Sequence, residues 1–115
     1  MSDPETITFS EFERVELRVG RIVSAEVFAE ARKPAYILHV DFGVPLGLRK
    51  SSARITDHYT CEELVGRLVV AVVNFPPKQI GPIQSQCLVT GFHDESGRVV
   101  LCVPDQDVPL GTKLL

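Results

Sequence analysis

The chain has 115 residues, of which 44% are hydrophobic and 23% charged. This composition is typical of one folded domain with its own core, and it excludes an intrinsically disordered chain. The net charge of −3 argues against a nucleic-acid binder that relies on overall basicity.

Residues 1–16 form an acidic N-terminal extension, in which five Asp and Glu residues face only Arg14. Ser10 and Glu13 have the spacing of a capping box, which predicts a short helix or turn here. We expect that element to lay Phe9 and Phe12 against the domain. The opening residues contain no basic region followed by an apolar stretch, so no secretory signal is expected.

Three strands are predicted in the first half of the chain. Residues 17–27 alternate between apolar and polar side chains, and Gly20 interrupts the alternation, which predicts a β-bulge at Gly20. Residues 36–42 alternate in the same way and form the second strand. The third strand, residues 48–52, is short and polar and follows the turn 43–47.

The second half begins with a short helix at residues 60–65, predicted from the capping-box spacing of Thr60 and Glu63 and from Gly66 as a stop. Residues 68–73 are continuously apolar, as in a buried strand, but are far shorter than the ~20 residues of a membrane helix. Residues 86–92 and 98–103 flank the hairpin turn 94–97.

The order of these elements predicts an all-β fold, the five-stranded Greek-key barrel of the OB-fold, with a short helix between strands three and four. We expect one domain over residues 1–115, with a C-terminal extension at 104–115. Cys61, Cys87 and Cys102 form no C-x-x-C pair and are interpreted as small buried hydrophobes in a reducing compartment. We therefore expect a cytoplasmic protein without membrane insertion.

No pattern indicates catalysis. His39, His58 and His93 are isolated in the sequence, and none has a second ligand at metal-binding spacing. There is no glycine-rich phosphate loop and no nucleophile next to a base. We expect neither enzymatic activity, nor a metal, nor a cofactor.

Residues 17–54 carry seven basic residues against three acids, a balance of +4. Because screening limits charge interactions to about 8–10 Å, such a local patch can bind phosphate on an acidic protein. An ordinary solvated surface is the alternative, and Tyr36 and Phe42 look core-facing, which weakens a base-stacking model. The candidate RNA-binding residues of this segment are Arg18, Arg32, Lys33, Arg49, Lys50, Ser51 and Ser52.

Five segments carry a resemblance to a known family: LRVGRIVSAE (17–26), DFG (41–43), RKSSARIT (49–56), VVNFPPKQI (72–80) and PDQDVPLGTKL (104–114). In this order they resemble the tRNA-binding domain family, and length and motifs are most similar to the CsaA group of export-related chaperones. The resemblance implies an OB-fold, a homodimer and tRNA binding without catalysis.

The family also implies that the segment after the fourth strand lies near the ligand. Asn74, Lys78 and Ser85 are added to the RNA-binding candidates on this ground. Two prolines, residues 76 and 77, fix φ and stiffen the loop that presents Lys78. We expect Asn74 to cap its own turn and Ser85 to begin the next strand, with a purely structural corner as the alternative.

The resemblance leaves a second function open: a chaperone that holds unfolded preproteins and cooperates with an export component. That function needs an exposed apolar patch, for which Ile80, Pro82 and Ile83 are the candidates. A subunit that only scaffolds another protein is a third possibility.

A two-fold homodimer is also expected. The segments 7–12 and 103–115 have no place in the barrel and carry apolar side chains that a symmetry mate can cover. The alternative is that both tails fold back on their own barrel.

Overall fold

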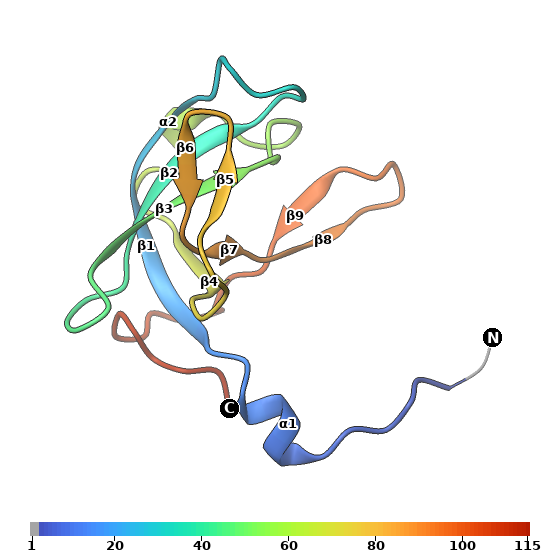
Figure 1. Cartoon of the computed structure of the whole chain (residues 1–115). Helices are drawn as coiled ribbons and strands as arrows, with labels where there is room; N and C mark the ends of the chain where they lie inside the picture. Colours follow the sequence, from blue (N-terminus) through green and yellow to red (C-terminus); the bar gives the residue numbers. More distant parts are fainter. Residues whose placement is uncertain (1–2) are drawn as a thin grey trace.

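The computed structural model describes residues 3–115. Its largest element is a strongly curved five-stranded antiparallel sheet with the strand order β3-β2-β1-β4-β7 (Figure 1). The strands are β1 (Leu17–Val27), β2 (Tyr36–Asp41), β3 (Leu48–Ala53), β4 (Leu68–Val72) and β7 (Leu88–Val89).

The sheet closes on itself where β3 meets the residues that precede β7. The Gln86 backbone N–H donates to the Lys50 carbonyl at 2.7 Å, and the Gln86 side-chain oxygen accepts from the Lys50 N–H at 2.9 Å. The free edge of β3 is thereby paired, as barrel architectures require. This nearly closed five-stranded barrel confirms the predicted OB-fold.

The barrel interior is filled by one row of apolar side chains from each long strand and by Leu64 of the helix α2 (Cys61–Leu64). The fully buried members are Ile22, Leu38, Val40, Phe42, Leu64, Val69 and Ala71. α2 lies between β3 and β4 and starts at Thr60, whose hydroxyl accepts from the Glu63 N–H while the Glu63 carboxylate accepts from the Thr60 N–H. The predicted helix and its capping box are confirmed.

The predicted bulge at Gly20 is wrong. Gly20 pairs regularly with Val69, and the register shift of β1 falls between Ile22 and Ser24. Gly20 is required for a different reason: a Cβ there would lie 2.5 Å from Cγ1 of Val40, closer than packed carbon atoms approach. The glycine lets β1 cross the crowded core at this point.

The N-terminal helix α1 (Phe9–Glu13) is present, but it begins at a different cap from the one predicted. Thr8 and Glu11 form the capping box, and Ser10 lies inside the helix. The Phe9 side chain is 68% exposed, so it does not pack against the domain as expected.

Two hairpins extend from the barrel. The first, β5 (Lys78–Ile80) and β6 (Ile83–Ser85), lies beside β3 in a segment that was expected to be a loop, and Ser85 ends β6 instead of beginning the next strand. The second, β8 (Gly91–His93) and β9 (Val99–Leu101), has the predicted turn at residues 94–97. Figure 1 shows β8–β9 projecting away from the barrel on the side of the N-terminal segment.

The C-terminal extension folds back on its own barrel. The Val19 N–H donates to the Thr112 carbonyl at 3.0 Å, the Gly111 N–H to the Val19 carbonyl at 2.8 Å and the Leu114 N–H to the Leu17 carbonyl at 2.8 Å. Residues 111–114 therefore run along β1 of the same chain, and the side chains of Leu114 and Leu115 remain exposed. Among residues 3–115, no helix is long and apolar enough to cross a membrane.

Candidate nucleic-acid interface

The side chains of β3 alternate between the core and the surface. Ser51 pairs with the buried Leu38 and is only 1% exposed, so its hydroxyl cannot contact RNA. Lys50 and Ser52 lie on the opposite face and are half-buried. The structure therefore removes Ser51 from the predicted RNA-binding residues and keeps its two neighbours.

The β5–β6 hairpin brings a second set of predicted residues to the same place. Lys78, the exposed first residue of β5, pairs with Ser85, and the Ser85 hydroxyl accepts a hydrogen bond from the Ser52 N–H at 3.1 Å. Lys78, Ser85 and Ser52 thus follow one another across the junction of hairpin and β3, next to Lys50. Four of the ten predicted residues meet here, although they come from segments about 30 positions apart.

The Ser85 hydroxyl also has a structural role. It accepts from Ser52 and lies 3.4 Å from the Cys87 carbonyl, to which it donates. This hydroxyl joins the hairpin to the barrel. Burial raises the pKa of the neighbouring Cys87 thiol to about 11, so the thiol stays protonated at neutral pH and is a poor nucleophile.

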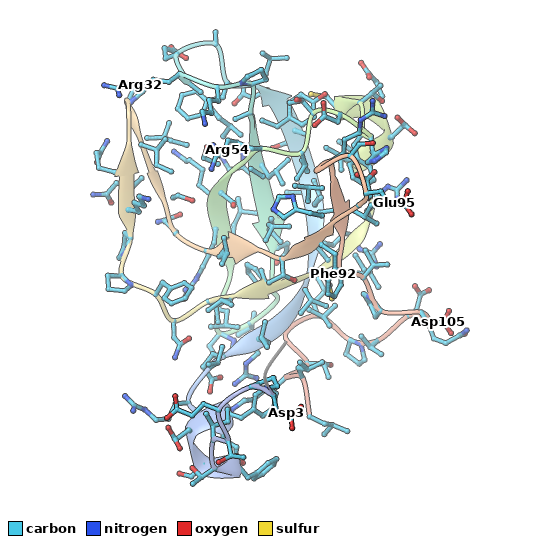
Figure 2. The ribbon with its side chains drawn as sticks, turned by 90° about the vertical axis from the view of Figure 1, so that its right-hand side faces the viewer. Asp3, Arg32, Arg54, Phe92, Glu95 and Asp105 are labelled. Atoms are coloured by element: carbon cyan, nitrogen blue, oxygen red, sulfur yellow. The ribbon has the colours of Figure 1, made fainter. Side chains whose placement is uncertain are left out.

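Three further basic residues extend this surface at one end of the barrel. Arg32 and Lys33 lie in the exposed β1–β2 loop, and the exposed Arg54 follows β3. Figure 2 shows Arg32 and Arg54 toward the upper left of the molecule, whereas Glu95 and Asp105 lie on the opposite side. Arg54 was not among the predicted site residues, although its position directly after the basic third strand was the signal for it.

Within residues 3–115, five basic side chains of this region have neither a hydrogen bond nor an ion pair to another residue. We call them the basic face. They are Arg32, Lys33, Lys50, Arg54 and Lys78.

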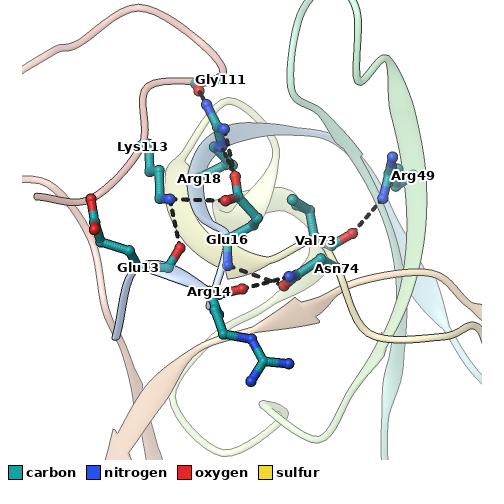
Figure 3. Close-up of polar contacts among 9 residues, drawn as sticks. All are labelled: Glu13, Arg14, Glu16, Arg18, Arg49, Val73, Asn74, Gly111 and Lys113. Carbon is teal, nitrogen blue, oxygen red and sulfur yellow. Dashed lines mark hydrogen bonds and ion pairs between the residues drawn. The ribbon is translucent and has the colours of Figure 1, made fainter. Parts of the chain in front are cut away.

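Arg18, by contrast, is bound within the fold (Figure 3). Its guanidinium donates to the Glu16 carboxylate through Nε at 3.0 Å and to the Gly111 carbonyl through Nη1 at 3.0 Å. The Lys113 ammonium donates to the same carboxylate at 2.8 Å and to the Glu13 carbonyl at 2.8 Å. Hydrogen bonds from Lys113 and then Arg18 hold the pKa of Glu16 below its usual range. Arg18 is therefore neutralised, and its predicted RNA contact finds no support here.

Arg49 and Asn74 hold the exit of β4 (Figure 3). Arg49 donates through Nη1 to the Val73 carbonyl at 2.7 Å. The Asn74 side chain accepts from the Glu16 N–H at 3.0 Å and donates to the Arg14 carbonyl at 2.7 Å. The expectation that Asn74 caps its own turn is wrong, because both of its side-chain partners lie about 60 positions earlier. Both residues position the loop that follows.

The apolar candidates lie at the tip of the β5–β6 hairpin. Ile80 and Ile83 pair with each other and are half-buried, so only Pro82 is exposed as expected. A Cβ at Gly81 would lie 3.7 Å from the buried Phe28 ring. The tip therefore touches the β1–β2 loop, beside an open hollow of about 460 Å³ that residues 27–36 line for the most part.

One exposed aromatic side chain was missed. Phe75 is 56% exposed and stands between Asn74 and the two prolines, in the loop that leads to Lys78. Its sequence signal was its position inside NFPPK, since an aromatic residue in a polar loop has no core to join.

Comparisons with known proteins agree with this geometry. Residues 17–113 match the family model of a putative tRNA binding domain. The crystal structure of the chaperone CsaA from Bacillus anthracis is 46% identical, covers 96% of this chain and 100% of that one, and has a TM-score of 0.90. The CsaA chaperone protein from Picrophilus torridus is 44% identical over the same shares, with a TM-score of 0.88.

Methionine–tRNA ligases also match. The enzyme from Pyrococcus furiosus is 35% identical over 108 residues, which are 94% of this chain but 14% of the ligase. The chain thus spans only about a seventh of the length of these ligases. The family match over residues 17–113, together with the barrel, shows that this chain belongs to the tRNA-binding domain family.

Proposed function

We propose that this chain is a non-catalytic tRNA-binding protein of the CsaA type that acts as a homodimer. The observation that carries the proposal is the basic face, whose five cations have no partner among residues 3–115, in a chain of net charge −3. A tRNA partner implies a cytoplasmic protein, and three free cysteines fit that reducing compartment.

The basic face fits the phosphate backbone rather than the base edges. Lysine and arginine side chains bind phosphates without sequence information, and backbone contacts set the position of the nucleic acid. Each neutralised phosphate releases counterions, so the affinity must fall as salt rises. A titration with total tRNA at about 50 and about 200 mM salt tests the proposal. Binding that weakens steeply with salt supports it, and no binding at the lower salt overturns it.

The local partners of the histidines support a non-catalytic role. His58 pairs with Asp94 at 2.8 Å and His93 contacts the Gly97 carbonyl at 3.1 Å, both within or next to the β8–β9 turn. The His39 ring contacts the Ser24 hydroxyl at 2.9 Å, but this pair lies on the exposed face of β1 and β2, outside the hollow. A hydrolytic site also needs a pocket and an oxyanion donor around such a pair.

Apolar side chains outside the barrel support the homodimer. The β8–β9 hairpin exposes Phe92 and Val100, and the N-terminal segment exposes Ile7 and Phe9. Both segments project from the same side of the barrel (Figures 1 and 2). Exposed apolar side chains of this kind mark a protein contact, and a two-fold pair is the commonest closed assembly that buries them.

Sedimentation at micromolar concentration tests the dimer. Twice the chain mass of 12.7 kDa supports it, and the chain mass itself rejects it. Phe92→Ser with Val100→Ser should convert the dimer to a monomer, whereas Arg98→Ser in the same hairpin should not.

The second candidate function is that of a chaperone that holds unfolded preproteins and cooperates with an export component. It is favoured by the likeness to two structures described as CsaA chaperones and by the hollow that residues 27–36 line for the most part. Suppression of the aggregation of a denatured client would support this function. If tRNA then competes with the client, the two roles share a surface, and independent binding would separate them.

A further inference from the structure

We propose that Phe75 is a stacking platform for an unpaired base of the RNA that lies on the basic face. This inference rests on the proposed tRNA-binding function and adds a residue that reads RNA structure rather than charge. Single-stranded RNA segments are bound by aromatic rings on which unstacked bases lie, next to cations that hold the backbone.

The backbone before Phe75 is held on three sides. The Val73 N–H donates to the Glu16 carbonyl at 2.9 Å, and the Val73 carbonyl accepts from Arg49 at 2.7 Å. The Asn74 side chain is bonded to both Glu16 and Arg14. Figure 3 shows the contact of Arg49 with Val73 and those of Asn74 with Glu16 and Arg14 at the end of β4. The residue that carries the ring thus begins from a fixed point.

The backbone after Phe75 is restricted as well. The pyrrolidine rings of Pro76 and Pro77 fix the φ angle of each residue near −65°. Lys78, which follows them, is paired with Ser85 in the hairpin. An exposed ring on a segment with so little freedom loses little entropy when a base stacks on it. Such preorganisation is what a binding platform needs and what a merely solvated loop lacks.

Local charge separates Phe75 from the other exposed phenylalanines. Phe9 lies in an acidic helix with Glu11 and Glu13, and Phe92 lies on the hairpin whose turn carries Asp94 and Glu95. Carboxylates repel an RNA backbone, so these two rings suit a protein partner.

Phe75, in contrast, lies two residues after Val73, whose carbonyl accepts from Arg49, and three residues before the exposed Lys78. Its ring is 56% exposed; Arg49, from β3, is bonded to the backbone before it, and Lys78 follows it in the chain. Phe75 is therefore the exposed ring that a base can approach together with its phosphate.

The absence of tryptophan from the chain gives a direct test. Phe75→Trp introduces one fluorophore, whose emission is expected to be quenched when tRNA binds, because a base stacks on the indole. Phe9→Trp and Phe92→Trp are the matched controls and are expected to keep their emission. A blunt RNA duplex without unpaired bases should leave the emission of Phe75→Trp unchanged.

Affinity measurements complete the test. Phe75→Ala is expected to weaken tRNA binding by about five- to 150-fold without changing the salt slope, because no phosphate contact is lost. Phe75→Tyr should keep the wild-type affinity, and Phe75→Leu, which is apolar but not aromatic, should not.

Two results would overturn the inference. Wild-type affinity in Phe75→Leu together with unquenched Phe75→Trp would show that no base stacks on this ring, while the tRNA binding of the wild type would leave the proposed function standing. Conversion of Phe75→Ala to a monomer in sedimentation would show that the ring is a dimer contact instead.

Discussion

Two pairs of basic side chains on the same barrel differ in what they bind. One pair is Arg18 and Lys113, and the other is Lys50 and Lys78. The first two share the Glu16 carboxylate and fasten the C-terminal segment to β1. The second two, on β3 and β5, have no carboxylate partner within the part of the chain that the structure describes.

The difference shows that a basic residue becomes a candidate for RNA binding through the lack of a partner, not through its charge alone. A cation already paired with a carboxylate must give up that pair before it can bind a phosphate, whereas an unpaired one only releases solvent and counterions. We therefore assign the contacts of Glu16 with Arg18 and Lys113 to the stability of the barrel and propose the basic face for RNA binding.

Reversing two charges of the basic face is expected to have the largest effect on tRNA affinity. Lys50→Glu with Lys78→Glu should weaken tRNA binding by on the order of 100-fold near physiological salt, because two phosphate contacts are lost and repulsion is added. Filter binding or fluorescence anisotropy measures it, and the free energy of unfolding should be unchanged.

Arg14→Glu with Arg98→Glu is the matched control, because it changes the net charge equally at two exposed positions outside the basic face. Its tRNA affinity should stay close to that of the wild type. An equal loss in both double variants would mean that only the total charge of the protein matters.

Asn74→Ala examines the structural side of the comparison. The substitution removes two hydrogen bonds between the end of β4 and the N-terminal segment, which should lower the free energy of unfolding by about 1–3 kcal/mol. Urea unfolding measures this value. Gln84→Ala on the exposed face of β6 is the control, and a loss no larger than in that variant would contradict the role assigned to Asn74.

Glu16→Gln removes a pH-dependent stabilisation of the same region, because glutamine does not titrate. Lys113 and then Arg18 lower the pKa of Glu16 from the ordinary 4.5, so the native carboxylate stays ionised where the unfolded one takes up a proton. The stabilisation is present above about pH 5 and is lost as the pH falls through 4.5 and below. The variant should therefore be less stable than the wild type at pH 7, and the gap should narrow toward pH 3.

Thermal unfolding of both proteins over this pH range provides the measurement. Asp94 has a lowered pKa as well, chiefly from its hydrogen bond with His58, and it affects both proteins alike, so the difference between them isolates Glu16. A gap that stays constant from pH 7 to pH 3 would show that the Glu16 carboxylate contributes nothing through its charge.

The sequence predicted the barrel well because its signals were local. Alternation located β1 and β2, and the Thr60–Glu63 spacing located α2. The same kind of signal failed at the N-terminus, where Thr8–Glu11 and Ser10–Glu13 both have the capping-box spacing and only the structure selects the first.

The errors at Gly20 and at the β5–β6 hairpin have physical reasons. A glycine in a strand marks either a bulge or a close approach of packed side chains, and at Gly20 the neighbours Val40 and Phe42 decide for the second. The β5–β6 hairpin had a sequence signal, because a glycine followed by a proline suits a two-residue turn with glycine first. In the structure this glycine, Gly81, has the positive φ of +55° that such a turn needs.

The site was harder to predict because partners distant in sequence decide it. Lys50, Ser52, Lys78 and Ser85 were all named as candidates, and the structure brings them together. The sequence could not show that Glu16 binds Arg18 against the C-terminal segment. Strand periodicity alone could have separated the buried Ser51 from Lys50 and Ser52.

The most direct test of the central claim compares two single neutralisations by the salt dependence of tRNA affinity. Lys78→Met removes a cation of the basic face, and Arg18→Met removes one that Glu16 already holds. We predict that the log–log salt slope becomes shallower by about 0.7–0.9 in Lys78→Met and does not change in Arg18→Met. Equal slopes in the two variants, or a loss confined to Arg18→Met, would contradict the account.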